Sequence, residues 1–124
     1  MSFLLDSHAV VWWTLEVGRL PVRARSALAA SDGAMVSAVS IWELEIKKAA
    51  GKLALDADLA ERVLASGFAP LLISFEHGVE AAKLPLHHRD PFDRMLIAQA
   101  RLEGLTLVSG DARMRLYDVP VLWD

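Results

Sequence analysis

Short apolar runs alternate along the chain with longer segments in which apolar residues recur at the spacing of a helix. This alternation is typical of an α/β fold with a largely parallel sheet, because each crossover between parallel strands carries a helix. The apolar runs predict strands at residues 3–6, 34–37, 71–74, 105–109 and 119–122. The segments between them predict helices at residues 7–16, 21–30, 40–51, 56–67, 74–83 and 90–104.

Helix-capping residues support several of these boundaries. Asp90 suits the position before a helix, Pro91 suits the first position within it, and Gly104 fits the end of the same helix. We expect Gly18 to stop the first helix, because glycine accepts the left-handed conformation found at helix ends. Ser40 is expected to begin the third helix.

The composition limits the kind of protein. The chain has 124 residues, which fits a single domain at residues 1–124, and its 54% share of hydrophobic residues predicts a surface buried against another molecule, such as a second copy or a protein partner. No apolar run approaches the roughly 20 residues that span a bilayer. The N-terminus reaches Asp6 without a basic segment, unlike a secretory signal, and the chain has no cysteine for disulfides or thiolate metal sites. We therefore expect a cytoplasmic protein with no membrane segment.

The charge of the chain bears on nucleic-acid binding. A net charge of −3 argues against a protein that wraps nucleic acid through many phosphate contacts, since such binding needs a local excess of Lys and Arg. An enzyme that touches RNA briefly is compatible with this charge. Metal ions held on carboxylates would supply the positive charge that the chain lacks.

Four acidic residues are predicted to meet at one edge of the sheet. Asp6 and Asp111 follow predicted strands, and ligands of open parallel sheets bind at the carboxyl ends of the strands. Glu43 and Asp93 lie in the predicted first turns of crossover helices, which begin at the same edge. Crowded carboxylates raise one another's pKa unless a cation intervenes, and all-oxygen ligands suit Mg²⁺ or Mn²⁺.

Structural roles for these acids stay open at this point. Glu43 completes Ser40-x-x-Glu43, the pattern of a capping box in which the Glu side chain returns to the first amide. Asp93 has the charge that favours a helix N-terminus, and Asp111 fits a turn after Gly110. Asp6 has a capping role only if the first helix begins directly after it.

The motifs that contain these acids resemble those of VapC-like PIN-domain ribonucleases, over essentially the whole chain and in the same order. LLDSH at 4–8 is similar to the family's Asp-Thr-His opening, and SAVSIWE at 37–43 to its second acidic motif. LHHRDPFDRMLIAQA at 86–100 is the most specific match, and LTLVSGD at 105–111 follows it at the family's spacing. The resemblance implies a PIN-like three-layer α/β/α sandwich with a mainly parallel sheet of about five strands.

The resemblance also implies an activity and a site. It predicts an endoribonuclease that hydrolyses RNA with a metal-activated water, acts as the toxin of a toxin-antitoxin pair, and binds a cognate antitoxin and a second copy of itself. The implied ligands of Mg²⁺ or Mn²⁺ are Asp6, Glu43, Asp93 and Asp111, with Asp93 preferred over Asp90. The number of ions stays open, and the alternative function is a catalytically weak PIN-like module that binds RNA or protein. Candidate substrate-binding residues are Ser7, Arg89, Asp90, Arg94 and Ser109.

Other conspicuous residues have competing interpretations. His8 is either a substrate contact or an ordinary polar residue of a helix start, and we favour the second. Adjacent His87 and His88 suggest zinc, but neighbouring side chains point in different directions and no Cys completes a site. Arg89 and Arg94 are equally compatible with holding RNA phosphate and with pairing to the nearby acids.

The sequence also predicts where the bulky and basic residues lie. Trp12 and Trp13 are adjacent, so we expect one of them to reach an interface unless both belong to the core. Trp42 is expected to pack against the site wall. The lysines are expected to form a solvated face; they are Lys47, Lys48 and Lys52.

Two other enzyme and signalling classes place an acid after the first strand. A haloacid-dehalogenase-like phosphatase needs a second acid two positions later, where this chain has His8. A receiver domain needs an acidic pair before the first helix and a lysine after the last strands, and the sequence provides neither.

Overall fold

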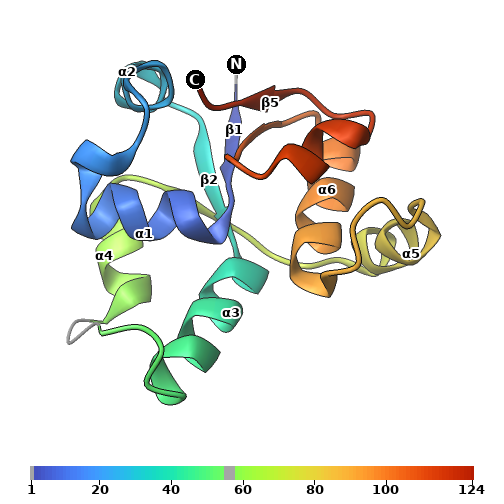
Figure 1. Cartoon of the computed structure of the whole chain (residues 1–124), viewed down its shortest axis with the longest axis horizontal. Coiled ribbons are helices and arrows are strands. Elements are labelled where there is room, and N and C mark those ends of the chain that lie inside the picture. Colours follow the sequence, from blue (N-terminus) through green and yellow to red (C-terminus); the bar gives the residue numbers. More distant parts are fainter. Residues whose placement is uncertain (1, 55–57) are drawn as a thin grey trace.

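The computed structural model describes residues 2–54 and 58–124, and Figure 1 shows their arrangement. The strands form one sheet, in which the described pairings are all parallel and the order is β3-β2-β1-β4-β5. Their bounds are β1 Phe3–Leu5, β2 Ala34–Ser37, β3 Ala69–Leu71, β4 Thr106–Val108 and β5 Val121–Leu122. The predicted sheet of about five mainly parallel strands is confirmed.

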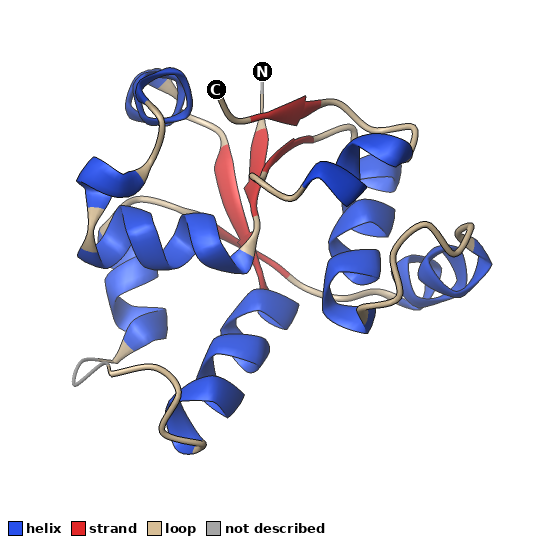
Figure 2. Ribbon diagram, in the orientation of Figure 1, coloured by secondary structure: helices blue, strands red, loops and turns tan. Residues whose placement is uncertain are grey.

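Helices cover both faces of this sheet. Their bounds are α1 Ser7–Leu15, α2 Val22–Ala30, α3 Ala38–Ala49, α4 Leu59–Ala65, α5 Phe75–Lys83 and α6 Pro91–Glu103. In Figures 1 and 2, α1, α2 and α4 lie on one side of the strands, whereas α5 and α6 lie on the other. The predicted three-layer α/β/α sandwich is therefore confirmed. No helix in the described part of the chain is long and apolar enough to cross a membrane.

Two apolar cores lie on either side of the sheet because side chains alternate along each strand. In β1, Phe3 and Leu5 join one core with residues of α1, α2 and α4. Leu4 points the other way and joins the second core with residues of α5 and α6. The core side chains of β1 are at most 5% exposed, as expected for a central strand covered on both faces.

Several predicted boundaries are confirmed by the capping geometry. Asp90 caps α6, Pro91 is its first residue, and Gly104 ends it in the left-handed conformation at φ 67°. The first helix begins at Ser7, so Asp6 is its N-cap. Asp56, the predicted start of the fourth helix, lies outside the described residues; within them, Asp58 caps α4.

Three predicted boundaries are wrong. The third strand is Ala69–Leu71 rather than residues 71–74, because the apolar Leu72 and Ile73 are exposed and follow the strand. Helix α3 begins at Ala38, after the cap Ser37, and not at Ser40. Gly18 lies inside a 3₁₀ turn instead of ending α1.

The topology places one end of each central strand beside helix N-termini. Since β1, β2 and β4 run parallel, their carboxyl ends share one edge of the sheet. Helices α1 and α3 begin directly after β1 and β2, so both start at this edge. The acidic residues of the sequence motifs therefore lie at this edge.

Candidate metal centre

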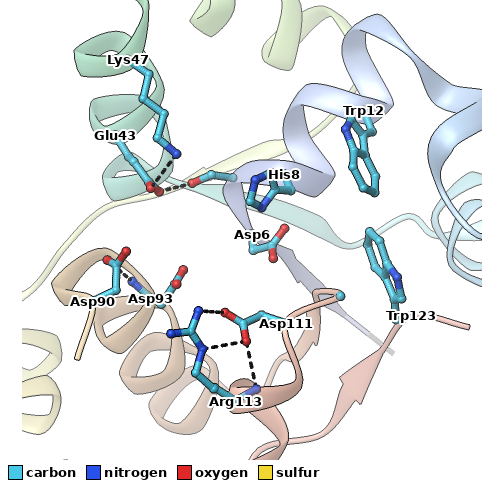
Figure 3. A pocket seen from close by; sticks show the side chains of 12 residues that line it. Asp6, His8, Trp12, Glu43, Lys47, Asp90, Asp93, Asp111, Arg113 and Trp123 are labelled. Atoms are coloured by element: carbon cyan, nitrogen blue, oxygen red, sulfur yellow. Dashed lines mark hydrogen bonds and ion pairs between the residues drawn. The ribbon is translucent and has the colours of Figure 1, made fainter. Parts of the chain in front are cut away.

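A cavity of about 460 Å³ lies at the carboxyl edge of the sheet. The four predicted acids line it together, each from a different part of the chain: Asp6 after β1, Glu43 in α3, Asp93 in α6 and Asp111 after β4. Figure 3 shows their side chains around a common space. The other lining residues are Ser7, His8, Trp12, Lys47, Asp90, Gly110, Arg113 and Trp123.

Asp6 has a structural contact in addition to its place in the cavity. Its Oδ1 accepts a hydrogen bond of 2.8 Å from the backbone N–H of Ala9 and so caps α1. Burial raises the pKa of Asp6, while a hydrogen bond from the Ser109 side chain lowers it. A nearby cation would favour the ionised form of a carboxylate that is buried in this way.

Glu43 does not form the capping box that the sequence suggested. Because α3 begins at Ala38, Glu43 lies beyond the first turn and cannot reach back to the helix start. Its buried carboxylate instead accepts a hydrogen bond from the Ser7 hydroxyl and lies 3.2 Å from Lys47 Nζ. Lys47 therefore belongs to the cavity and not to a solvated face, which corrects the sequence interpretation.

The two acids at the start of α6 differ in their contacts. Asp90 Oδ1 accepts hydrogen bonds from the backbone N–H groups of Phe92, at 2.8 Å, and Asp93, at 3.4 Å. Burial raises the pKa of Asp93 to about 6, and the negative charge of Asp90 contributes in the same direction. Asp90 therefore caps α6 through Oδ1, as Asp6 caps α1, and both Asp90 and Asp93 line the cavity.

Asp111 is held by the residue two positions after it. Arg113 contacts its carboxylate through Nε at 3.1 Å and Nη2 at 2.9 Å, and donates its backbone N–H at 2.9 Å. These contacts lower the pKa of Asp111. The sequence predictions did not include Arg113; its position two residues after a turn acid is the signal that would have identified the pair.

His88 lies at the site, although the sequence argued against a metal site at His87 and His88. Its ring is 2% exposed, and Nε2 lies 2.8 Å from Asp93 Oδ2 and 3.2 Å from Asp111 Oδ2. One ligand atom from each of these three residues falls within 4.8 Å of the others, a spacing compatible with a metal ion. Nothing in the local sequence distinguishes His88 from His87, because the contact to Asp111 spans 23 positions.

The structure brings only some of the candidate substrate-binding residues to the cavity. Ser7 and Asp90 line it, whereas Arg89, Arg94 and Ser109 do not. Arg94 donates hydrogen bonds to backbone carbonyls instead of facing a substrate or pairing with an acid; the acceptors are Ala81, Leu84, Pro85 and His88. The Arg94 guanidinium therefore binds backbone carbonyls and lies outside the cavity lining.

The tryptophans adopt different roles from those expected. Trp12 stacks at a tilt on Trp123, 5.6 Å between centroids, and both line the cavity. Trp13 packs against Phe68 inside the molecule, so both adjacent tryptophans have intramolecular partners. Trp42 is 61% exposed rather than part of the site wall.

The fold and this cavity define a class of α/β protein with an oxygen-rich acidic centre at the carboxyl edge of a parallel sheet. Residues 3–120 match the PIN domain family, and the chain belongs to that family.

Similar proteins agree with this assignment. The chain is 34% identical to Ribonuclease VapC22 of Mycobacterium tuberculosis, over 96% of this chain and 94% of the relative. The fold resembles that of VapBC2 from Rickettsia felis bound to a promoter DNA fragment, with a TM-score of 0.74, 15% identity and full coverage of both chains. It also resembles a toxin-antitoxin complex from Klebsiella pneumoniae, with a TM-score of 0.67, 19% identity, and coverage of 98% and 96%.

Proposed function

We propose that this protein is a metal-dependent endoribonuclease and the toxin of a VapBC-like toxin-antitoxin pair. The observation that carries the proposal is the convergence of Asp6, Glu43, Asp93 and Asp111 on one cavity, although they are scattered over the chain. Membership of the PIN family and the identity to a relative named as a ribonuclease support it. The substrate is RNA and the reaction is hydrolysis of its phosphodiester bonds.

The side chains of the cavity fit a hard divalent cation. The four acids offer only oxygen atoms, which suit Mg²⁺ or Mn²⁺. Burial raises the pKa of both Asp6 and Asp93, so a cation that favours their ionised forms relieves an unfavourable arrangement. We assign Asp6, Glu43, Asp93 and Asp111 as the residues that hold the ion.

The chain's own residues orient these ligands and balance their charge. Ser7 donates to Glu43, and Asp6 accepts from the backbone N–H of Ala9, so each of these two carboxylates is held by a hydrogen bond. Lys47 and Arg113 contribute positive charge from opposite sides of the cavity, where it favours the approach of a phosphate. A bound divalent cation supplies the chemistry that activates water and stabilises the leaving oxygen.

Substitution of Asp6 tests this function. We expect purified wild-type protein to cleave RNA with Mg²⁺ or Mn²⁺ and to be inactive with excess chelator. Asp6→Asn keeps an acceptor for the α1 cap but removes a charge from the cavity, so activity should fall at least about 100-fold, the size of a lost transition-state contact. Asp32→Asn is the matched control, because Asp32 is exposed and precedes β2 at the other edge of the sheet.

The outcomes separate the candidate functions. Cleavage that persists in chelator, or in Asp6→Asn, contradicts the metal mechanism. A wild-type protein that binds RNA without cutting it under any metal condition supports the catalytically weak binding module instead.

We also propose an antitoxin and a second copy of the chain as protein partners. Large apolar side chains stay exposed on several elements, including Phe75 at 97% and Leu72 at 73%. A second, mainly apolar cavity of about 240 Å³ lies between α3 and α4, lined by residues such as Ile41 and Val63. Light scattering of the purified chain and co-purification with the product of the neighbouring gene test these contacts. A monodisperse monomer that the neighbouring product does not bind contradicts both.

A further inference from the structure

One imidazole joins two of the proposed metal ligands. His88 Nε2 lies within hydrogen-bonding distance of Asp93 in α6 and of Asp111 after β4, at 2.8 and 3.2 Å. The two carboxylates come from separate elements and would repel each other without a group between them. His88 therefore acts either as a further ligand of the ion, beside the four acids, or as a hydrogen-bond donor that holds Asp93 and Asp111.

The other nitrogen of the ring decides between these roles. Nδ1 of His88 accepts a hydrogen bond from the backbone N–H of Asp90, at 3.3 Å. An accepting nitrogen carries a lone pair and no proton, so a neutral ring must carry its proton on Nε2. Nε2 then has no lone pair for a cation, and it donates to the carboxylates instead.

Backbone contacts fix the place of this ring independently of the acids. The N–H of His88 donates to the Tyr117 hydroxyl at 2.9 Å, and Tyr117 donates in turn to the carbonyl of Pro85. The carbonyl of His88 accepts from Arg94 Nη1 at 3.1 Å. The backbone of His88 is thus held on both sides of its Cα, so its ring has a fixed place from which it can position the carboxylates of Asp93 and Asp111.

We infer that His88 is a positioning residue whose Nε2–H holds Asp93 and Asp111 together for cation binding, without being a ligand itself. The inference rests on the proposed function, since the cation is the one assigned to the four acids. Groups that hydrogen-bond to metal ligands typically change metal affinity by about 10- to 100-fold when removed.

Three substitutions separate the donor from the ring. The amide nitrogen of His88→Gln reaches the place of Nε2 and keeps a donor there, whereas the shorter His88→Asn imitates only Nδ1, and His88→Leu removes both. His87→Leu is the matched control, because the exposed His87 ring packs on Tyr117 and contacts neither acid. The probe is Mn²⁺ alone, titrated calorimetrically into the full chain, with melts in chelator to compare folding.

We expect wild type, His88→Gln and His87→Leu to bind Mn²⁺ with affinities within a few-fold of one another. His88→Asn and His88→Leu should bind about 10- to 100-fold more weakly, and excess Mn²⁺ should restore their RNA cleavage, since the four ligands remain. Wild-type affinity in His88→Leu, or a loss in His88→Gln as large as in His88→Leu, overturns the inference.

A measurement on the wild-type chain avoids dependence on the folding of variants. Long-range ¹H–¹⁵N spectra of ¹⁵N-histidine-labelled protein report which ring nitrogen carries the proton. We expect the Nε2–H form of His88 both without and with Mg²⁺. An Nδ1–H form, or loss of the Nε2 proton when Mg²⁺ binds, overturns the donor role. Failure of wild type to bind Mn²⁺ or to cleave RNA contradicts the proposed function itself, whereas normal wild-type behaviour with unaffected His88 variants contradicts only this inference.

Discussion

The fold opposes the ionisation of Asp93. Burial raises its pKa to about 6, and Asp90, Glu43 and Asp6 add negative charge around it, while His88 acts in the opposite direction. Asp111 shows the contrary case, because its hydrogen bonds from Arg113 lower its pKa. The pKa values of these two carboxylates in one cavity are thus shifted in opposite directions by their surroundings, and the two groups should respond differently to pH.

The raised pKa of Asp93 predicts how the metal-free protein responds to acid. A group with a raised folded pKa adds stability below its unfolded pKa, near 3.8, and loses that contribution as pH rises through about 6. Lowering the pH from 7.5 to 5 should therefore raise the free energy of unfolding of the metal-free protein by about 1.4 kcal/mol, because pH 5 lies about one unit below the folded pKa of Asp93. Thermal melts in chelator measure this, and Asp93→Asn should remove that part of the pH dependence. An identical pH dependence in both proteins would show that Asp93 is ionised normally.

Glu43 permits a second test at the level of one side chain. Glu43→Gln keeps an oxygen that can accept from Ser7 but removes the charge that pairs with Lys47 and that we assign to the cation. We expect metal-free stability to change by less than about 1 kcal/mol, since one partly exposed ion pair contributes little. RNA cleavage and stabilisation by Mg²⁺ should fall sharply. Full activity in Glu43→Gln would remove Glu43 from the proposed ligands.

The connection between α5 and α6 depends on one guanidinium. Arg94, in the second turn of α6, donates to carbonyls at the end of α5 and in the following loop, at 2.8 to 3.1 Å. These carbonyls have few other donors where a helix ends. The same loop carries His88, so Arg94 links the packing of two helices to the geometry of the site.

Replacement of Arg94 should therefore destabilise the packing of α5 against α6, and not only the hydrogen bonds of Arg94 itself. Arg94→Ala leaves several carbonyls without this donor. We expect the free energy of unfolding, measured with urea, to fall by about 3 kcal/mol. Arg94→Lys should lose less but remain clearly destabilised, because an ammonium cannot reproduce the planar fork. Arg89→Ala is the control, since Arg89 is exposed and outside the cavity. Equal stability of Arg94→Ala and Arg89→Ala would contradict this role.

Across the whole molecule, the cavity joins parts of the chain that are distant in sequence. Its acids come from the end of β1, from α3 and α6, and from the segment after β4. A ligand that binds several of them favours the folded state, because the unfolded chain does not bring them together. Cation binding and global stability should therefore change in parallel.

Mg²⁺ should raise the urea midpoint of the wild-type chain as its concentration increases, with an unchanged m-value. At a concentration 100 times the dissociation constant the gain should be about 2.7 kcal/mol. The same ionic strength supplied by Na⁺ is the control for screening. A gain that Na⁺ matches, or that Asp6→Asn retains in full, would indicate general charge screening in place of a specific site.

The sequence by itself determined the order of elements, the parallel sheet and the acids that would reach its carboxyl edge. These features depend on local patterns, such as the apolar run of β1 and the Asp90, Pro91 and Gly104 signals of α6, which act between close neighbours along the chain. An apolar pattern does not report burial, however. The third strand was misplaced because Leu72 and Ile73 are apolar and exposed.

Only the tertiary structure decided how the acids are held. The contact of Ser7 with Glu43 spans 36 positions, and that of His88 with Asp111 spans 23. Such contacts follow from the way helices pack on the sheet, which no local spacing encodes. The start of α3 shows the same limit, because both Ser37 and Ser40 suit a helix N-terminus in sequence. In the structure Ser37 is the N-cap, so Glu43 lies in the second turn of α3 and lines the cavity instead of closing a capping box.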